Sequence, residues 1–589
     1  MRWAVAPRAS AQVQITEALK IIRQYLSVDL PLSQVRLVTG FNPLHLQTFL
    51  QAYLQQRLST RRVVVSTDVF GDMTGALARI HPSLLDMGAI ALEWQDLDPR
   101  LGFRQLGGWG YKDLADIVTD ARAMLGTIRE SLADLPEGFH LALSLPTLDL
   151  PPIFYTPSWQ LCEAEISLRQ AVDEFAFWAS GRPDIRLVGP HRRQIDAISS
   201  QVFDLRADLT AGLPYAIDHA DKLAQSFARL LVPSLPKKGL ITDLDETLWA
   251  GIAGEVGPSA VSWDLDSKTQ LHGLYQQLLR ALSDQGVLIA VASKNDPELV
   301  EAVFQRNDIV LPRDLIFPVE AHWNAKSESV TRILETWNVH ADSVVFVDDS
   351  PSELAEVKAA HPEMECLRFD GQDHANVYGL LFQLRDMFVK QTITHEDTLR
   401  RESLRSGSIF REAVRSPIVS QENFLRDAEA KIAFDFTAIK NPRTLELVNK
   451  ANQFNLNGNR YSEAEWRDSF SGSSAFVVNA IYRDKYGPLG VIAMLAGQVS
   501  QTEMTVKTWV MSCRAFGRRI EYQCLRTILD RFSVREIKFE FSPTTRNGYM
   551  REYLTSFLGK QPDGPFSISR AAFLDKCPTL YHEVEVSHE

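Results

Sequence analysis

Residues 239–254 read GLITDLDETLWAGIAG, in which a short apolar run is followed at once by two aspartates, Asp243 and Asp245. The segment just before it, LLVPSLPKKG at 230–239, carries two prolines and a final glycine, a composition typical of a linker. In an open parallel sheet, ligands bind outside the carboxyl ends of the strands. The stretch therefore predicts a buried strand at 239–242 that delivers two carboxylates to the binding edge of a sheet.

Strands and helices are expected to alternate regularly after this stretch, because apolar residues recur with the matching periods. The expected strands are 239–242, 287–292, 343–347 and 365–368, and the expected helices are 268–284, 296–305, 325–337 and 352–360. Such alternation predicts a doubly wound α/β domain with a parallel sheet.

The chain is expected to hold further domains, because 589 residues are too many for one hydrophobic core. Before the linker, expected strands at 35–39, 62–67, 88–92 and 139–144 alternate with helices at 43–58 and 112–135; after the central domain, strands are expected at 475–482, 489–495, 504–511 and 535–541. The sequence predicts a multidomain α/β protein with four parts: an α/β domain at 1–230, a central domain at 236–380, a charged helical connector at 381–430 and a domain of mixed strands and helices at 431–589.

Composition and charge indicate which partners and which compartment to expect. The formal charge of -12, from 62 basic and 74 acidic residues, has the wrong sign for nucleic-acid binding. The five cysteines lie far apart without zinc-type spacing, which favours a reducing, cytoplasmic compartment. We expect no signal peptide and no membrane span, because no apolar run reaches about 18 residues.

Four short motifs of the central domain carry candidate chemistry, each after an apolar strand or at a helix start. They are D-x-D-x-T at Asp243, Asp245 and Thr247, the segment Ser293, Lys294 and Asn295, then Lys326, and finally the pair Asp348 and Asp349. A lone D-x-D pair is more often a solvated turn, and a lone Ser-Lys or Asp-Asp pair is no more specific. All four in this order favour catalysis.

The set suits phosphoryl transfer through a covalent intermediate. We expect Asp243 to attack phosphorus, and Asp245 to protonate the leaving oxygen and then activate water. Repulsion between a carboxylate and a phosphate would be offset by Mg²⁺, which prefers oxygen ligands. The candidate metal ligands are Asp243, Asp245, Asp348 and Asp349, Lys326 is a catalytic cation, and the candidate substrate-binding residues here are Thr247, Ser293, Lys294 and Asn295.

These motifs resemble those of the haloacid dehalogenase-like (HAD) superfamily, and the wider segment is similar to the FkbH-like family of its subfamily IIIC. The resemblance rests on DLDETLWAGIAGEVG (243–257), VASKND (291–296), FVDDSP (346–351), ANQFNLNGNRYSEAE (451–465) and WVMSCRAFGRR (509–519). It implies a Rossmann-like three-layer α/β/α domain that uses Mg²⁺. It also implies an enzyme that dephosphorylates 1,3-bisphosphoglycerate, or a similar phosphorylated small acid, and loads the glyceryl group on the phosphopantetheine of an acyl carrier protein, in polyketide or related biosynthesis.

One position departs from the relatives. Where they often carry a cysteine before the serine of the second motif, this chain has Ala292, so no thioester can form there. Cys513 in MSCR is the candidate replacement and is counted among the substrate-binding residues, with a plain core cysteine as its alternative. Direct passage of the acyl group to the carrier, or a different substrate, also stays open.

The region 431–589 resembles a GNAT-like acyltransferase fold. A strand ending near Met511 runs into a turn with Gly517 that opens a helix, where backbone N–H groups can hold a phosphopantetheine arm. Further candidates for substrate contact are Asn452, in a polar cluster with Gln453 and Asn455, and Asn547 and Tyr553 near the end of the chain. Helix capping and core packing are the alternatives for Asn547 and Tyr553.

The region 1–230 is similar to flavodoxin-like or SGNH-hydrolase-like domains. Thr39 and Asn42 are the nearest substitutes for the nucleophilic serine of an active hydrolase. Asp218 and His219 are neighbours in an expected helix, so their side chains do not face each other. We therefore expect this domain to support docking or dimerisation rather than catalysis.

Three functions compete at this point. The first is a Mg²⁺-dependent HAD-like phosphatase and acyl transferase, the second a simple phosphatase of a small phosphorylated metabolite, and the third a non-catalytic scaffold of a biosynthetic assembly line. The intact set of four motifs counts against the scaffold. A homodimer stays an open alternative.

Overall fold

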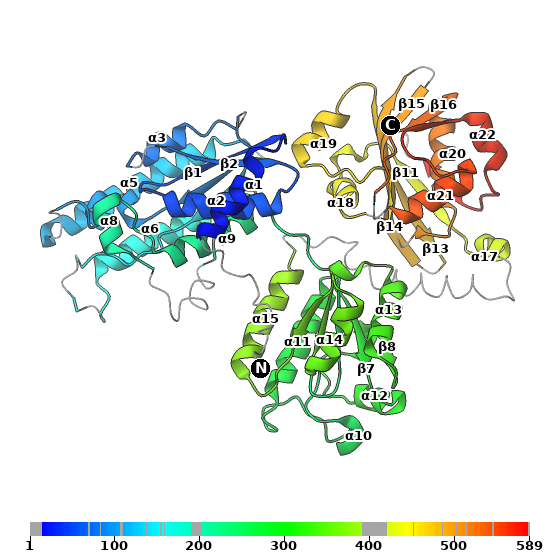
Figure 1. Ribbon diagram of the computed structural model, residues 1–589, viewed down its shortest axis with the longest axis horizontal. Coiled ribbons are helices and arrows are strands. Elements are labelled where there is room, and N and C mark those ends of the chain that lie inside the picture. Colours follow the sequence, from blue (N-terminus) through cyan, green and yellow to red (C-terminus); the bar gives the residue numbers. More distant parts are fainter. Residues whose placement is uncertain are drawn as a thin grey trace. The chain divides into compact units, whose positions relative to one another are not determined.

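The computed structural model describes residues 15–68, 71–82, 84–106, 110–136, 138–152, 156–157, 159–189, 202–390, 421–451, 453–485, 487–500, 503–512, 515–544 and 547–586 (Figure 1). The chain divides into two compact units, Met1–Leu235 and Pro236–Glu589. The division lies within the proline-containing segment 230–239. Most of the expected connector, 391–420, lies outside the described residues.

The first unit is built on a parallel sheet with the strand order β2-β1-β3-β4-β5, the order of flavodoxin-like sheets. The strands are β1 Leu32–Val38, β2 Arg62–Thr67, β3 Met87–Ala91, β4 His140–Ser144 and β5 Ile185–Leu187. The helices are α1 Ile15–Leu26, α2 Leu44–Arg57, α3 Met73–Ala78, α4 Trp94–Leu97, α5 Leu114–Ala133, α6 Glu163–Ser180, α8 Leu205–Ala211 and α9 Ile217–Leu231.

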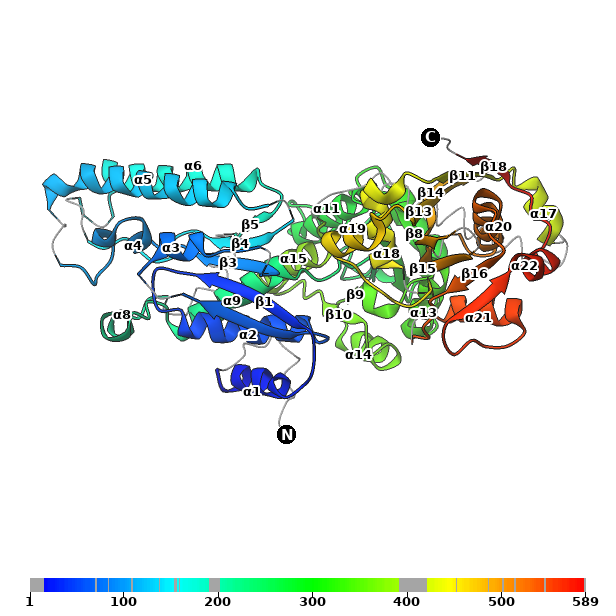
Figure 2. The same cartoon turned by 90° about the horizontal axis from the view of Figure 1, so that it is seen from above.

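Helices cover both faces of this first sheet (Figure 2). One core cluster joins Ile90 and Leu143 of the sheet to α5 and α6. The other joins Val35 and Ala142 to α1, α2 and α9. Because successive residues of a strand point to opposite faces, a doubly covered strand must be apolar throughout. The β-branched and apolar residues of the sequence predicted β1 to β4, whereas the three-residue strand β5 was not predicted.

The second unit begins with another parallel sheet, in the order β10-β9-β6-β7-β8. Its strands are β6 Gly239–Thr242, β7 Leu288–Ser293, β8 Ile316–Ala321, β9 Val344–Asp348 and β10 Glu365–Arg368. Its helices are α10 Ala253–Val256, α11 Gln270–Asp284, α12 Pro297–Phe304, α13 Lys326–Trp337, α14 Pro351–Ala360 and α15 His374–Phe388. The predicted alternation is confirmed, and β8 is an edge strand that the sequence did not reveal.

Strand β6 lies at the centre of this sheet, between β7 and β9. Leu240 packs in the cluster that contains α11, α12 and α15 residues, and Ile241 packs in the cluster of α13 and α14. Strand order reverses at β6, because the chain runs to β7 on one side and later returns to β9 on the other. Such a switch point is where doubly wound sheets bind ligands.

The remainder of the second unit is an eight-stranded, mainly antiparallel sheet in the order β17-β16-β15-β14-β13-β11-β18, with β12 paired to β15. Its strands are β11 Lys431–Asp435, β12 Phe454–Asn455, β13 Ala475–Asp484, β14 Gly487–Val499, β15 Glu503–Met511, β16 Glu536–Phe539, β17 Phe566–Ser569 and β18 Glu583–Val586. Its helices are α17 Gln421–Asp427, α18 Pro442–Lys450, α19 Glu463–Phe470, α20 Ile520–Phe532, α21 Gly548–Leu558 and α22 Arg570–Lys576.

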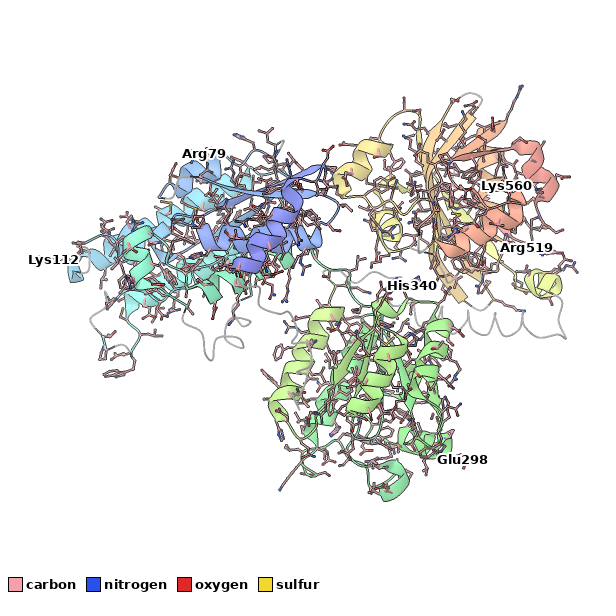
Figure 3. All side chains as sticks on the ribbon, viewed as in Figure 1. Arg79, Lys112, Glu298, His340, Arg519 and Lys560 are labelled. Carbon is pink, nitrogen blue, oxygen red and sulfur yellow. The ribbon has the colours of Figure 1, made fainter. Side chains whose placement is uncertain are left out.

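The chain is thus an α/β protein with parallel sheets and several domains, as the sequence predicted. Charged side chains such as Arg79, Lys112 and Glu298 are exposed at the periphery of their own domains (Figure 3). Within the described ranges, no helix has the length and apolar character needed to cross a membrane.

Gly239, the first residue of β6, is expected not to tolerate a side chain. A Cβ there would lie 2.4 Å from the indole of Trp337, which is fully buried at the end of α13. We expect Gly239→Ala to lower the free energy of local opening of β6 by about 1–3 kcal/mol, because overpacking strains a buried ring. Hydrogen exchange of β6 peptides in the full chain measures this. Gly379→Ala, in α15 with open space around its Cβ, is the control and should not weaken protection; unchanged exchange in Gly239→Ala would contradict the packing argument.

Candidate active site

Three carboxylates converge where the adjacent strands β6 and β9 end. Asp243 follows β6 directly and its backbone N–H donates to the Val347 carbonyl at 3.0 Å, which extends the pairing of the two strands. Asp348 is the last residue of β9, and Asp349 follows it. Each of the three offers one oxygen, and these oxygens lie within 4.8 Å of one another. The structure therefore brings together carboxylates that are over 100 residues apart in the sequence.

Lys326 supplies the positive charge of this cluster from the first position of α13. Its Nζ lies 2.6 Å from Asp348 Oδ2 and 3.0 Å from Asp243 Oδ1, and all three side chains are buried. Burial alone would lower the pKa of the Lys326 ammonium, but the two carboxylates outweigh burial and raise that pKa. The lysine therefore stays charged between the two acids.

The acids remain crowded in spite of the lysine. Burial, and then the Asp243 carboxylate, raise the pKa of Asp348, against the opposing effect of Lys326. Burial and Asp243 also raise the pKa of Asp349. Both directions mean that the negative charge is held at a cost, because one ammonium pairs with two of three neighbouring carboxylates.

The residues of the cluster fit a divalent cation. Asp243 Oδ1 is buried and pairs with Lys326 Nζ at 3.0 Å, and this single contact leaves lone pairs available. Carboxylate oxygens are the ligands that Mg²⁺ prefers, and a small cation that keeps some of its water needs few protein ligands. Asp243, Asp348 and Asp349 are therefore the side chains that could hold Mg²⁺.

The carboxylate of Asp245 is not in this group. Its Oδ1 accepts hydrogen bonds from Trp249 Nε1 at 2.8 Å and from the Ala253 backbone N–H at 3.1 Å, and its Oδ2 accepts from Asn295 Nδ2 at 2.9 Å. Burial raises the pKa of Asp245, although the Ala253 and Trp249 hydrogen bonds oppose that shift. These donors hold the side chain in one orientation, while its assignment as a metal ligand stays a prediction.

A tight reversal after β6 creates this arrangement. Glu246 has a left-handed backbone with φ of 56°, and its Oε1 accepts from the Gly251 N–H at 2.8 Å. The reversal carries Thr247 back under the sheet edge, where its buried hydroxyl lies 3.5 Å from Asp349 Oδ1. Thr247 thus lies against the acidic cluster, as its sequence position suggested.

The segment after β7 contributes to the same edge in two ways. Ser293 ends β7 and is buried, and Asn295 is buried where it donates to Asp245. Lys294 instead forms an ion pair with Glu353 at 2.8 Å, on a partly exposed surface. The structure places all three near strand ends, but it assigns Asn295 a role in orienting Asp245 that the sequence did not indicate.

Ala292, the position that departs from the relatives, is buried in β7. It belongs to the core cluster that also contains Ile241, Val330 and Trp337 of β6 and α13. Its side chain therefore packs in the core beneath α13.

Two further candidates, Asn452 and Cys513, lie outside the described residues. Their neighbours have structural contacts: Asn455 Nδ2 donates to the Ala451 carbonyl at 3.1 Å, and Asn547 Nδ2 donates to the Asn455 carbonyl at 3.2 Å. Tyr553 is buried, and its hydroxyl has no hydrogen-bond partner.

The candidates of the first unit do not form a dyad. Thr39 Oγ1 donates to the Phe41 carbonyl at 2.7 Å, and Asn42 Nδ2 donates to the Ala211 carbonyl at 3.1 Å. On α9, Asp218 is exposed while His219 is buried, with Nε2 at 2.9 Å from Thr147 Oγ1. The two neighbours thus point in different directions, as helical geometry requires.

Two positioning residues were missed by the sequence argument. Trp249 orients Asp245, and Glu353 on α14 neutralises Lys294. Trp249 stands in the same stretch, four residues after Asp245, so a polar nitrogen on a buried ring was an available signal. Glu353 gave no such signal, because its contact joins residues 59 positions apart.

Comparisons with known proteins add a structural likeness. Neither the scan against protein-family models nor the search of curated proteins finds a match. The chain is similar to a crystal structure of the N-terminal part of the protein BF1531 from Bacteroides fragilis, which contains a phosphatase domain complexed with Mg: TM-score 0.52, 18% identity, 64% of this chain and 99% of that chain covered. An MnaA–UDP structure from S. aureus matches with a TM-score of 0.14 and 10% identity, over 64% of this chain and 97% of that chain. The first likeness shows a shared fold, and the second carries no argument.

The geometry predicts which acids bind a metal. We expect Asp348→Asn to weaken Mg²⁺ binding by roughly tenfold or more, because it removes a buried ligand charge. Asp245→Asn should weaken it far less, because protein donors already occupy that carboxylate. Calorimetric titration of chelator-treated full-length protein measures both, with the exposed Asp266→Asn as a control for charge. Equal losses in the Asp245 and Asp348 variants would show that Asp245 is itself a ligand.

Proposed function

We propose that the chain is a Mg²⁺-dependent enzyme of the HAD-like type, which removes phosphate from a phosphorylated small acid and passes the acyl product to an acyl carrier protein. The observation that carries the phosphatase part is the cluster of Asp243, Asp348 and Asp349 around Lys326 at the switch point of a parallel sheet. The likeness to the Mg-complexed phosphatase domain of the Bacteroides fragilis protein supports it.

Asp243 is the proposed nucleophile. Its carboxylate attacks phosphorus, a covalent aspartyl phosphate forms, and the bond from phosphorus to the leaving oxygen breaks. Asp245 gives its proton to that oxygen, then takes a proton from the water that attacks the aspartyl phosphate, and inorganic phosphate leaves. The hydrogen bonds from Trp249, Ala253 and Asn295 hold Asp245 in place for this exchange.

The remaining residues neutralise and bind the phosphoryl group. Lys326 sets a positive charge beside Asp243, where negative charge gathers as the nucleophile approaches phosphate. Ser293 and Thr247 are the proposed donors to the phosphoryl oxygens. Both side chains are buried, and the Thr247 hydroxyl lies 3.5 Å from Asp349 Oδ1. A bound Mg²⁺ would offset the repulsion between the carboxylate and the dianionic phosphate.

The proposed acyl transfer belongs to the antiparallel sheet, for which we propose a GNAT-like fold. Several buried polar atoms there lack hydrogen-bond partners, among them Trp509 Nε1 on β15, Glu521 Oε2 on α20 and the Tyr553 hydroxyl on α21. The Trp509 and Tyr553 rings lie 5.9 Å apart, and burial raises the pKa of Glu521 to about 7. Unpartnered buried polar atoms are costly, so these three atoms support an occupant with amide or carbonyl groups, such as a phosphopantetheine arm.

For a substrate such as 1,3-bisphosphoglycerate, we propose that Asp243 removes the phosphate of the ester at carbon 3, which leaves the acyl phosphate at carbon 1 for the carrier. The acyl step then balances without another reactant. The carrier thiol attacks the acyl-phosphate carbonyl, the carbon–oxygen bond to phosphate breaks, and the phosphate leaves with the thiol proton.

We propose a cytoplasmic location and a separate docking or dimerising role for the SGNH-like first unit.

We expect Asp243→Asn to lower the rate of phosphate release by on the order of 10³-fold or more, because the nucleophile is lost. Asp245→Asn should slow it by roughly 10²–10⁴-fold through loss of acid–base catalysis. Colorimetric phosphate release from 1,3-bisphosphoglycerate with Mg²⁺ measures both, corrected for spontaneous hydrolysis of the acyl phosphate. Asp266→Asn is again the control, and an unaffected rate in Asp243→Asn would refute the nucleophile assignment.

Tyr553→Phe is expected to separate the two activities. The change removes an unpartnered buried hydroxyl, so it should leave the melting temperature unchanged or higher, while carrier loading falls by about 3–10-fold. Intact mass of the carrier protein measures loading. Phosphate release in a parallel reaction without the carrier protein should not change; the carrier is left out because loading itself releases phosphate from the acyl phosphate. Tyr461→Phe, whose hydroxyl lies 3.0 Å from Thr508 Oγ1, is the matched control and should affect stability but not loading. Phosphate release without any gain in carrier mass in the wild type would leave a simple phosphatase.

A further inference from the structure

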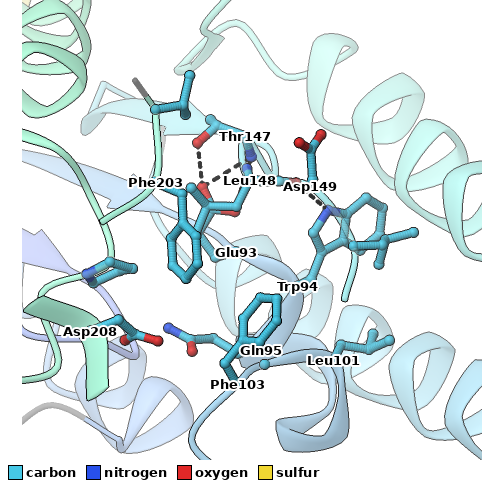
Figure 4. A pocket seen from close by; sticks show the side chains of 14 residues that line it. Glu93, Trp94, Gln95, Leu101, Phe103, Thr147, Leu148, Asp149, Phe203 and Asp208 are labelled. Atoms are coloured by element: carbon cyan, nitrogen blue, oxygen red, sulfur yellow. Dashed lines mark hydrogen bonds between the residues drawn. The ribbon is translucent and has the colours of Figure 1, made fainter. Parts of the chain in front are cut away.

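A pocket of about 440 Å³ opens in the first unit, far along the sequence from the proposed phosphatase residues (Figure 4). It lies where the chain leaves β3 and β4, so it occupies the carboxyl edge of the first parallel sheet. The lining includes Trp94, Phe103, Phe203 and Leu150, with the acids Glu93 and Asp208. Its volume is in the range of sites for small molecules.

Glu93 is fully buried at the inner end of the pocket and is satisfied by the protein itself. Its oxygens accept from the Thr147 and Leu148 backbone N–H groups, from Thr147 Oγ1 at 2.6 Å and from the Tyr215 hydroxyl at 2.6 Å. The dashed bonds in Figure 4 show this clamp between Glu93 and Thr147. Glu93 therefore joins the loops after β3 and β4 and has no need of a ligand.

Asp208 is different, although it is buried as deeply. It lies on the short helix α8, is 1% exposed and lines the pocket, and its Oδ1 has no hydrogen-bond partner. Figure 4 shows its carboxylate directed toward the amide end of Gln95 within the pocket. Burial raises the pKa of Asp208, and the positive charge of Arg104 opposes that shift. A buried acceptor without a partner is costly unless something else supplies a donor.

The walls of the pocket restrict which ligand can pair with Asp208. Phe103 and Phe203 stack with ring centroids 5.3 Å apart. The indole N–H of Trp94 is already bonded to the Leu148 carbonyl at 2.9 Å, so its ring offers only apolar surface and a π face. Among the described lining residues there are three acids, Glu93, Asp149 and Asp208, and no lysine or arginine. Arg104 acts on Asp208 electrostatically but is not one of these lining residues. An anion would meet repulsion from the three acids, and an uncharged apolar group would leave Asp208 Oδ1 without a hydrogen bond.

We propose that this pocket binds a small organic ammonium ion with an apolar or aromatic body, whose charged nitrogen pairs with Asp208 while its body lies against Trp94, Phe103 and Phe203. Aromatic faces attract cations as well as apolar groups, so the walls and the acid select the same ligand class. The proposal is independent of the phosphatase function, because none of these residues belongs to the second unit.

The first test compares three probes of nearly equal shape on the full-length wild-type protein. 2-Phenylethylamine is a cation, 2-phenylethanol is its neutral counterpart, and phenylacetate is an anion. Calorimetry should show binding of the amine, at least about tenfold weaker binding of the alcohol, and no binding of the acid. Equal binding of amine and alcohol, or tighter binding of the acid, would overturn the proposal, as would no binding of the amine.

The second test uses Asp208→Asn, which keeps the side-chain shape and removes its charge. We expect the affinity for 2-phenylethylamine to fall by about tenfold or more, while the melting temperature of the ligand-free protein stays the same or rises. If Asp208 served stability alone, Asp208→Asn would lower the melting temperature and leave the affinity for 2-phenylethylamine unchanged. Asp218→Asn, an exposed acid of the same unit, is the control and should change neither quantity. Unchanged amine binding in a folded Asp208→Asn protein would refute the pairing.

Discussion

The candidate site depends on one contact, the buried ammonium of Lys326 between the carboxylates of Asp243 and Asp348. Adjacent parallel strands bring those two acids together, and without a cation their repulsion in a buried place would strain the sheet edge. Helix α13 offsets this repulsion with a residue at one end and packs against β6 with a residue at the other. Its first residue meets the acids at the carboxyl end of β6, and its last residue, Trp337, packs on Gly239 at the other end. The same helix therefore fixes the strand and balances its charge.

Much of this could be read from the sequence, because the governing signals are local. A strand covered on both faces is apolar throughout, and side chains that follow such strands must meet at one edge. Asp243, Ser293 and Asp348 each follow or end an apolar run, and the structure places them at the ends of β6, β7 and β9. Strand β8 escaped prediction because it is an edge strand, with only its first residue buried and Pro318 inside it.

What could not be read are the contacts that depend on tertiary packing. The sequence offers Asp245 as an acid beside Asp243, but three donors from separate elements decide where its oxygens point. Pairings between Lys294 and Glu353, or Glu93 and Tyr215, join residues far apart and follow from no local pattern. The unpartnered atoms of Trp509, Glu521 and Tyr553 also follow from no local pattern, because their burial depends on the packing of β15, α20 and α21.

The two parallel sheets present the same electrostatic problem and solve it differently. Each carries buried carboxylates at its carboxyl edge, where a ligand is expected. In the second unit, Lys326 supplies a charge from within the chain, and the surplus of acid leaves room for a metal ion. In the first unit, backbone and hydroxyl donors satisfy Glu93, but Asp208 Oδ1 accepts no hydrogen bond. A fold keeps a costly buried acid where binding offsets the cost. A buried carboxylate without hydrogen-bond donors in the protein therefore indicates a ligand site better than the number of carboxylates does.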